Sequence, residues 1–195
     1  MVIVAMLGAC VGDATDGPDA GVITSDQLVP IDGTRLPGAE SIARAMEWVD
    51  AQLHYCQAPN HQRDYDAACT TTCNREDNIE WDPYRSDCSG LVSWAWKLPA
   101  PGRVTSQFAP FKTDLTYAIM ATDLRPGDAI NNSTHIMLFE TWIDKPTKAR
   151  FIEEPGCSSS QPYAREYTAT VMAMGNSLVV TGRATYTAIR YDEAP

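Results

Sequence analysis

The cysteines constrain the fold of this chain more than any other feature of its sequence. The 195 residues include six cysteines: Cys10, Cys56, Cys69, Cys73, Cys88 and Cys157. This number in an exported chain is typical of disulfides. Cys10 and Cys88 lie in segments that indicate other roles, so four cysteines remain. We predict that these four form two disulfides, and the sequence does not choose among the three pairings.

A structural zinc site is the alternative for the same cysteines. Cys56, Cys69 and Cys73 could bind zinc together with His54 or His61. Their spacing matches none of the common zinc-finger patterns. We therefore favour disulfides, and we expect neither a metal ion nor an organic cofactor.

The segment that holds three of these cysteines has no hydrophobic period. Residues 56–87 are polar and contain prolines. A loop of this length inside a compact domain is uncommon unless other interactions hold it in place. Two disulfides would do so, and the loop therefore supports the same interpretation as the cysteine count.

The amino-terminal segment predicts export. Residues 1–10 are apolar and end in Leu7-Gly8-Ala9-Cys10, which has the form of the lipobox of bacterial lipoproteins. The segment is too short to span a membrane and has no basic start, so either Met1 is not the true start or the match is accidental. We interpret residues 1–10 as a signal remnant, residues 11–29 as a flexible tether and residues 30–195 as the folded domain.

The sequence also indicates where the protein is located and which partners it can bind. We expect a periplasmic or cell-envelope lipoprotein with a lipid anchor at Cys10, or a secreted protein. The formal net charge is −10 and the isoelectric point is near 4.6, without a cluster of Lys or Arg, which excludes nucleic acid as a partner. With 44 % hydrophobic residues the chain can bury one core, so we expect a single-domain monomer.

Hydrophobic periodicity predicts helices first and strands afterwards. Residues 39–55 carry apolar side chains at helical spacing, and a second helix begins at Ser86 or Asp87 and ends before Pro99. A turn at residues 124–128 opens a first strand. The other predicted strands are 135–139, 149–153, 178–181 and 185–191, of which the first two form a hairpin. This order predicts an α+β domain.

Cys88 lies at the predicted start of the second helix, where backbone N–H groups and the helix dipole favour a thiolate. A cysteine nucleophile also needs a base and a group that orients the base. Of the three histidines, His135 begins an apolar strand, and the hairpin brings Glu153 onto the same sheet face. We predict a Cys88–His135–Glu153 triad, with Glu154 as the alternative third member.

Three motifs surround these residues. They are Asp87-Cys88-Ser89-Gly90-Leu91-Val92, Leu124-Arg125-Pro126-Gly127-Asp128 ahead of His135-Ile136, and Phe151-Ile152-Glu153-Glu154-Pro155-Gly156. Over about Glu40 to Tyr191, the chain resembles the NlpC family of papain-like cell-wall cysteine peptidases. The resemblance implies a papain-like α+β fold with amino-terminal helices packed on an antiparallel sheet. It also implies Cys88 as the nucleophile, His135 as the base and Glu153 as the residue that orients His135.

The same resemblance implies a substrate, the peptide part of peptidoglycan, cleaved at an amide next to a D-amino acid. We assign substrate binding to Tyr55, which is similar in position to a family tyrosine, and to Ser89, Trp81 and Tyr84 around the nucleophile. Cys56-Gln57 stands where the family has Trp-Gly-Gly. The tryptophans of the second helix are expected in the core.

Two other functions stay open. The long loop ahead of Cys88 would permit a thiol hydrolase or acyltransferase that acts on another amide or ester. A non-enzymatic, disulfide-rich lipoprotein would instead use all six cysteines in three bridges. The sequence contains no G-x-S-x-G, G-x-x-x-x-G-K or H-E-x-x-H motif, so hydrolysis by a thiol is the leading chemistry.

Overall fold

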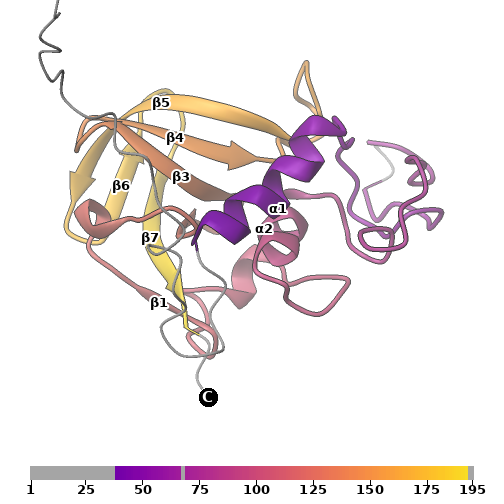
Figure 1. The fold of residues 1–195 in the computed structure, drawn as a ribbon, viewed down its shortest axis with the longest axis horizontal. Helices are drawn as coiled ribbons and strands as arrows, with labels where there is room; N and C mark the ends of the chain where they lie inside the picture. The colour runs from indigo at the N-terminus through magenta and orange to yellow at the C-terminus, as the bar shows by residue number, and fades with distance from the viewer. Residues whose placement is uncertain (1–37, 67–68, 193–195) are drawn as a thin grey trace, which may run out of the picture.

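The computed structural model describes residues 38–66 and 69–192, which form a barrel of strands with two α-helices against its wall (Figure 1). The helices are α1 (Gly38–Asp50) and α2 (Cys88–Ala95), with short 3-10 turns η2 (Thr105–Gln107) and η3 (Ala121–Asp123). The strands are β1 (Thr116–Ala118), β2 (Ala129–Asn131), β3 (Ile136–Asp144), β4 (Lys148–Glu153), β5 (Arg165–Met174), β6 (Ser177–Val180) and β7 (Thr185–Tyr191). The predicted signal remnant, the tether and residues 30–37 lie outside the described residues.

The strands pair antiparallel in the order β1-β7-β2-β3-β4-β5-β6, and β6 also pairs with β7. This last pairing closes six strands into a barrel, and β1 lies along β7. The prediction of a papain-like α+β fold, with amino-terminal helices packed on a sheet, was therefore wrong. The described part of the chain is mostly β and has only two α-helices. The sequence analysis missed β5, the strand that links β4 to β6 and so lets the sheet close.

The hairpin of β3 and β4 shows how the sheet bends. Leu138 lies opposite Ile152, and the register shifts between Phe139 and Thr141 and again between Trp142 and Asp144. Each shift adds a residue to one strand, which increases local twist and curvature. Curvature of this kind allows a short sheet to close on itself.

Both faces of this hairpin are buried, against two different cores. Met137, Phe139 and Phe151 point into the barrel and pack with residues of β5, β6 and β7. Leu138 and Ile152 point the other way and pack with the tryptophans and leucines of the helical layer. The alternation of side chains along each strand therefore separates an inner core from a helix-facing core.

The second predicted helix is confirmed, and Asp87 caps it. Asp87 Oδ1 accepts hydrogen bonds from the Gly90 backbone N–H at 2.6 Å and from Ser89 Oγ at 2.9 Å. All eight residues of α2 are buried, and both predicted core tryptophans, Trp94 and Trp96, are 2 % exposed. A Cβ on Gly90 would lie 1.8 Å from the Arg85 carbonyl oxygen, so the chain needs glycine there. The first helix ends at Asp50, five residues before its predicted end at residue 55.

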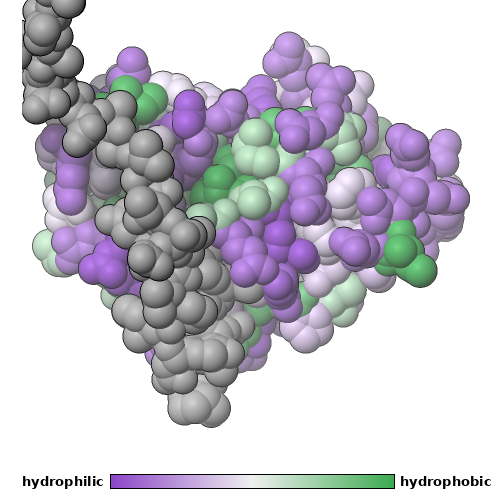
Figure 2. Space-filling view, in the orientation of Figure 1, coloured by the Kyte–Doolittle hydropathy of each residue, from purple (hydrophilic) through white to green (hydrophobic). Residues whose placement is uncertain are grey.

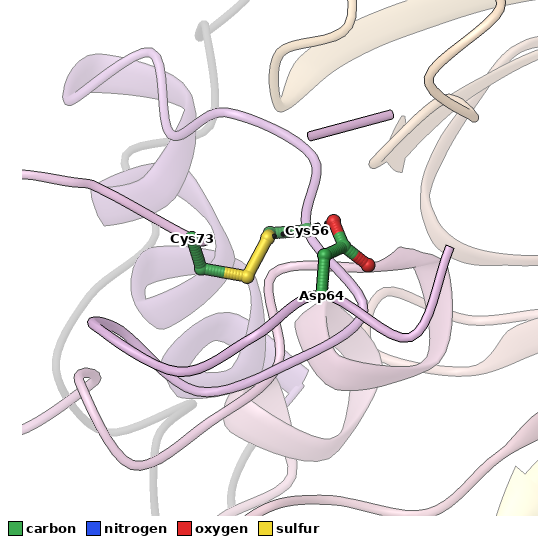
Figure 3. Close-up of side chains that lie close together, drawn as sticks. All are labelled: Cys56, Asp64 and Cys73. Atoms are coloured by element: carbon green, nitrogen blue, oxygen red, sulfur yellow. Dashed lines mark hydrogen bonds between the residues drawn. A yellow bond between two sulfur atoms is a disulfide. The ribbon is translucent and has the colours of Figure 1, made fainter. Parts of the chain in front are cut away.

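The long loop after α1 is held by two disulfides, as predicted. Cys56 bonds to Cys73, and Cys69 bonds to Cys157 in the β4–β5 connection. Figure 3 shows the first disulfide, with Asp64 beside it at 3.0 Å from Cys56 Sγ. Since these sulfur atoms bond to one another, the zinc alternative for the same cysteines was wrong.

Disulfides indicate a non-cytosolic, oxidising compartment. The face drawn in Figure 2 is mainly hydrophilic, with small groups of hydrophobic residues. Neither described helix has the length and apolar character needed to cross a membrane.

Candidate active site

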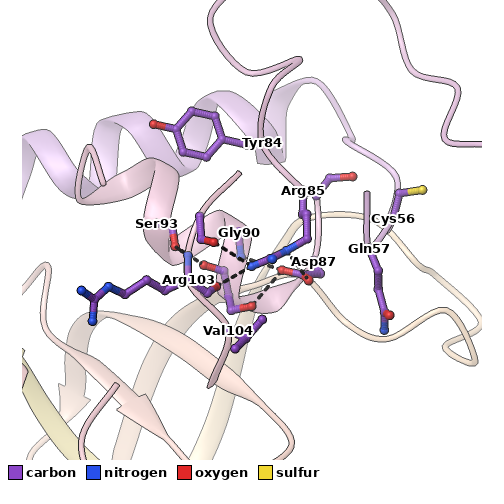
Figure 4. Close-up of polar contacts among 12 residues, drawn as sticks. Cys56, Gln57, Tyr84, Arg85, Asp87, Gly90, Ser93, Arg103 and Val104 are labelled. Atoms are coloured by element: carbon purple, nitrogen blue, oxygen red, sulfur yellow. Dashed lines mark hydrogen bonds and ion pairs between the residues drawn. The ribbon is translucent and has the colours of Figure 1, made fainter. Parts of the chain in front are cut away.

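Polar contacts fix the amino terminus of α2 from several sides (Figure 4). Arg85 Nε donates to Asp87 Oδ2 at 3.1 Å, and Arg85 Nη2 donates to the carbonyl oxygens of Gly102 and Arg103. The Arg103 backbone N–H donates to Ser93 Oγ at 2.9 Å. The first turn of α2 is therefore tied to the loop that follows the helix, and Cys88 sits on a rigid support.

Cys88 is the free cysteine among the described residues, and its side chain reaches strand β3. The residue is 8 % exposed. The backbone N–H groups of Ile136 and Ser89 donate to its sulfur. Because Ile136 directly follows His135, the sulfur lies against the strand end that carries the predicted base.

The resting thiol of Cys88 is strongly disfavoured from ionising. Burial raises its pKa to about 12, and the negative charge of Asp87 acts in the same direction. The two backbone N–H donors lower the pKa but do not offset burial. The expected benefit of the helix start for a thiolate is therefore outweighed by desolvation, and a neighbouring base must remove the proton.

His135 and Glu153 come together at the open ends of β3 and β4. His135 Nε2 lies 3.0 Å from Glu153 Oε2, and the carboxylate is completely buried. A carboxylate can only accept, so Nε2 carries the hydrogen in this pair and Nδ1 is the remaining basic nitrogen. The hydrogen bond to Glu153 therefore orients the ring and selects its tautomer.

Two arginines that the sequence analysis missed also bind Glu153. Arg165 donates to Oε1 from Nε at 3.0 Å and from Nη2 at 2.8 Å. Arg183 donates to Oε2 from Nη1 at 2.6 Å and to Oε1 from Nη2 at 2.8 Å. Burial raises the pKa of Glu153, but the hydrogen bonds from His135, Arg183 and Arg165 outweigh it and hold this pKa well below its usual value.

Glu154, the predicted alternative, occupies a different environment. It is fully buried on the helix-facing side, and neither carboxyl oxygen has a hydrogen-bond partner. Burial raises its pKa well above the usual value, the charge of Asp87 adds to this, and Arg75 partly opposes it. His135 therefore donates to Glu153, while burial disfavours the charged form of Glu154, which lies near Cys88.

Two of the predicted substrate residues lie beside Cys88. The Tyr55 hydroxyl accepts a hydrogen bond from Gln57 Nε2 at 2.9 Å. Burial raises the pKa of Tyr55 to about 12, and the charges of ionised Cys88 and Asp87 contribute. Ser89 is buried and its hydroxyl donates a hydrogen bond to Asp87, so this side chain stabilises the start of α2. Gln57 was missed because it has no motif of its own.

Trp81 and Tyr84, predicted at a substrate rim, pack against the helix-facing core. Tyr84 is buried, donates to the Leu98 carbonyl oxygen at 2.6 Å and packs edge-on against Trp94, which makes it a core residue. Trp81 lines a separate pocket of ≈ 470 Å³ together with His54 and Arg75. The structure therefore gives Tyr84 a packing role and places Trp81 at a neighbouring surface.

Comparisons with known proteins find no match for this chain. The chain matches no family model, and the searches of curated proteins and of solved structures find no similar protein. The site must therefore be interpreted from its own geometry.

Proposed function

We propose that this protein is an exported cysteine hydrolase in which Cys88 is the nucleophile, His135 the base and Glu153 the residue that orients the base. One observation carries the proposal. The unbridged sulfur of Cys88, at the start of α2, accepts the N–H of the residue next to His135, and the Nε2 of His135 is held by Glu153. This combination supports nucleophilic catalysis by a thiol.

Acylation begins with the transfer of one proton. Nδ1 of His135 takes the proton of Cys88 Sγ as the sulfur attacks the carbonyl carbon, because the neutral thiol is the resting form. The backbone N–H of Cys88, at the first residue of α2, is a natural donor to the resulting oxyanion. The tetrahedral intermediate then breaks its C–N bond, and His135 returns the proton to the leaving amine.

Deacylation uses the same groups in reverse. Water attacks the thioester while His135 Nδ1 takes a proton from it, the C–S bond breaks, and the sulfur of Cys88 regains the proton. Glu153 keeps the imidazole in one orientation through both half-reactions. No step requires a metal ion or an organic cofactor.

Peptidoglycan stem peptides are the proposed substrate, on the basis of the three motifs that resemble the NlpC family. The disulfides agree with an extracytoplasmic location, where this substrate lies. A lipid anchor at Cys10 would keep the enzyme at the cell envelope. Cys10 itself and the tether lie outside the described residues.

The test is mass spectrometry of purified peptidoglycan after incubation with the full-length chain and with Cys88→Ala. New stem-peptide fragments that disappear with Cys88→Ala would support the proposal and identify the bond. Thr147→Ala is a suitable control, since this exposed threonine lies in the β3–β4 turn and its hydroxyl binds only Asp144. An intact wall after treatment with the folded wild-type protein would contradict the proposed substrate.

A thiol hydrolase or acyltransferase for another amide or ester is the second candidate. It is favoured by the disulfide-linked loop, whose Tyr55 and Gln57 lie near the nucleophile in place of the family's usual residues. Labelling of Cys88 by amide and ester probes, without cleavage of peptidoglycan, would select this candidate. The non-enzymatic alternative with three disulfides is not favoured, because Cys88 is unbridged.

A further inference from the structure

We infer that Arg165 and Arg183 are positioning residues that hold the Glu153 carboxylate in place as the acceptor for His135 and offset its negative charge. This inference deepens the proposed function and rests on it for its catalytic meaning. Both arginines act through Glu153 and the orientation of His135, and neither is assigned a contact with substrate.

The geometry shows two arginines directed at one carboxylate. Arg165 begins β5 and is the cross-strand partner of Glu153, while Arg183 lies in the turn between β6 and β7. Together they supply four N–H···O contacts between 2.6 and 3.0 Å, and His135 supplies the fifth. The barrel closure is what brings Arg183 to Glu153, since the turn that carries it lies between the two strands that close the sheet.

Burial makes this arrangement electrostatically strong. Glu153 has no exposed side-chain surface, and the side chains of Arg165 and Arg183 are 31 % and 23 % exposed. The Arg183 guanidinium also lies 3.8 Å from the centre of the Tyr167 ring, which covers one of its faces. Charges shielded from water interact more strongly than surface charges, so these arginines contribute more than an exposed ion pair would.

The charge balance changes what Glu153 does for His135. A single carboxylate beside an imidazole stabilises the imidazolium form. Here two positive guanidinium groups accompany one negative carboxylate, which leaves one net positive charge before His135 ionises. Glu153 therefore orients His135 through a hydrogen bond, while the arginines oppose a positive charge on the ring.

The surroundings of the Cys88 thiol favour its uncharged form. Burial and Asp87 oppose the Cys88 thiolate, and Glu154 on the helix-facing side is a buried acid without a hydrogen-bond partner. With the thiolate opposed, the proton stays on sulfur until a carbonyl is available to accept the attack. This is a general-base site in which the ion pair does not form in advance.

The test is the rate at which iodoacetamide alkylates Cys88 between pH 6 and pH 9, followed by mass spectrometry. Arg183→Met should raise the rate near pH 7 by about tenfold, because a shift of one pH unit in the Cys88–His135 equilibrium corresponds to a factor of ten. Arg165→Met should act in the same direction. Arg150→Met, which removes an arginine of β4 that binds Glu140 and Glu166, should leave the rate unchanged.

A charge-retaining variant separates the electrostatic role from loosened packing. Arg183→Lys should be alkylated at a rate near that of the wild type. Nitrogen-15 histidine spectra should show the hydrogen of His135 on Nε2 in the wild type and in Arg183→Lys. An Arg183→Met rate equal to or below the wild-type rate, or equal acceleration by Arg183→Lys and Arg183→Met, would overturn the inference. The readout needs no substrate, so it is independent of whether peptidoglycan is cleaved.

Discussion

Two adjacent glutamates at the end of β4 show how the two faces of the barrel wall differ. Glu153 points into the mouth of the barrel, where His135, Arg165 and Arg183 all donate to it. Glu154 points toward the helical layer, where no hydrogen bond reaches either oxygen. The two residues are equally buried and differ by one position in the chain, yet their pKa values move in opposite directions.

The comparison shows that the partners of a buried carboxyl, and not burial alone, decide whether it carries charge. Inside the barrel mouth, donors from the residue before β3, from β5 and from the β6–β7 turn offset desolvation, and the acid is ionised. On the helix-facing side, Asp87 adds a like charge and Arg75 only partly offsets it, so the acid stays neutral. The ionised residue can orient a base, and the neutral one can lie near Cys88 without adding a full negative charge.

The largest change in the free energy of unfolding is expected for Glu153→Gln. This change leaves two partly buried arginines without their counter-charge, and we expect a loss of about 3 kcal/mol in the free energy of unfolding at pH 7. Because the pKa of Glu153 is lowered by folding, wild-type stability from this residue is present above about pH 4.5 and is lost as the pH falls through the lowered value. Urea unfolding at pH 7 and pH 3 should show a difference between the two proteins that shrinks on acidification. A constant difference would contradict the charge argument.

Glu154→Gln is expected to change stability by less and in the opposite direction, so that the variant is more stable than the wild type at pH 7. The pKa of Glu154 is raised in the folded protein, so the wild type loses stability as the pH rises above about 4.5. Glutamine resembles the neutral acid and has no such penalty. Thermal unfolding should give equal midpoints for both proteins at pH 4 and a higher midpoint for Glu154→Gln at pH 7. Equal midpoints at both pH values would show that Glu154 is not a buried neutral acid.

The smallest effect is expected for Arg150→Met, on an exposed part of the same strand. Arg150 Nε lies 2.7 Å from Glu140 Oε2 and 3.3 Å from Glu166 Oε1, with 39 % of its side chain exposed. Ion pairs at the surface contribute about 0.5 kcal/mol, and salt screens them. Urea unfolding in low and high salt should show little change from the wild type. A loss comparable to that of Glu153→Gln would show that burial does not separate the two sites.

The presence of disulfides could be predicted from the cysteine count, and the local features of the site could be predicted because they depend on residues close together in the chain. Asp87 caps the helix that begins with Cys88, since an N-cap acts within one turn. The hairpin brings His135 and Glu153 together through a short connection, and the count of cysteines is enough to predict two bridges. The pairing of Cys69 with Cys157, 88 residues apart, could not be chosen, because chain spacing does not specify distant contacts.

The sequence by itself determined the helix start at Cys88, the hairpin with His135 and Glu153 and the presence of disulfides, because each rests on local spacing or on residue chemistry. Only the tertiary structure decided the closed barrel, since closure requires β5 and the distant pairing of β6 with β7. The same closure brings Arg183 to Glu153, and the β4–β5 register brings Arg165 there. The charge of a buried group depends on neighbours from every packed element, and those neighbours exist only after the chain has folded.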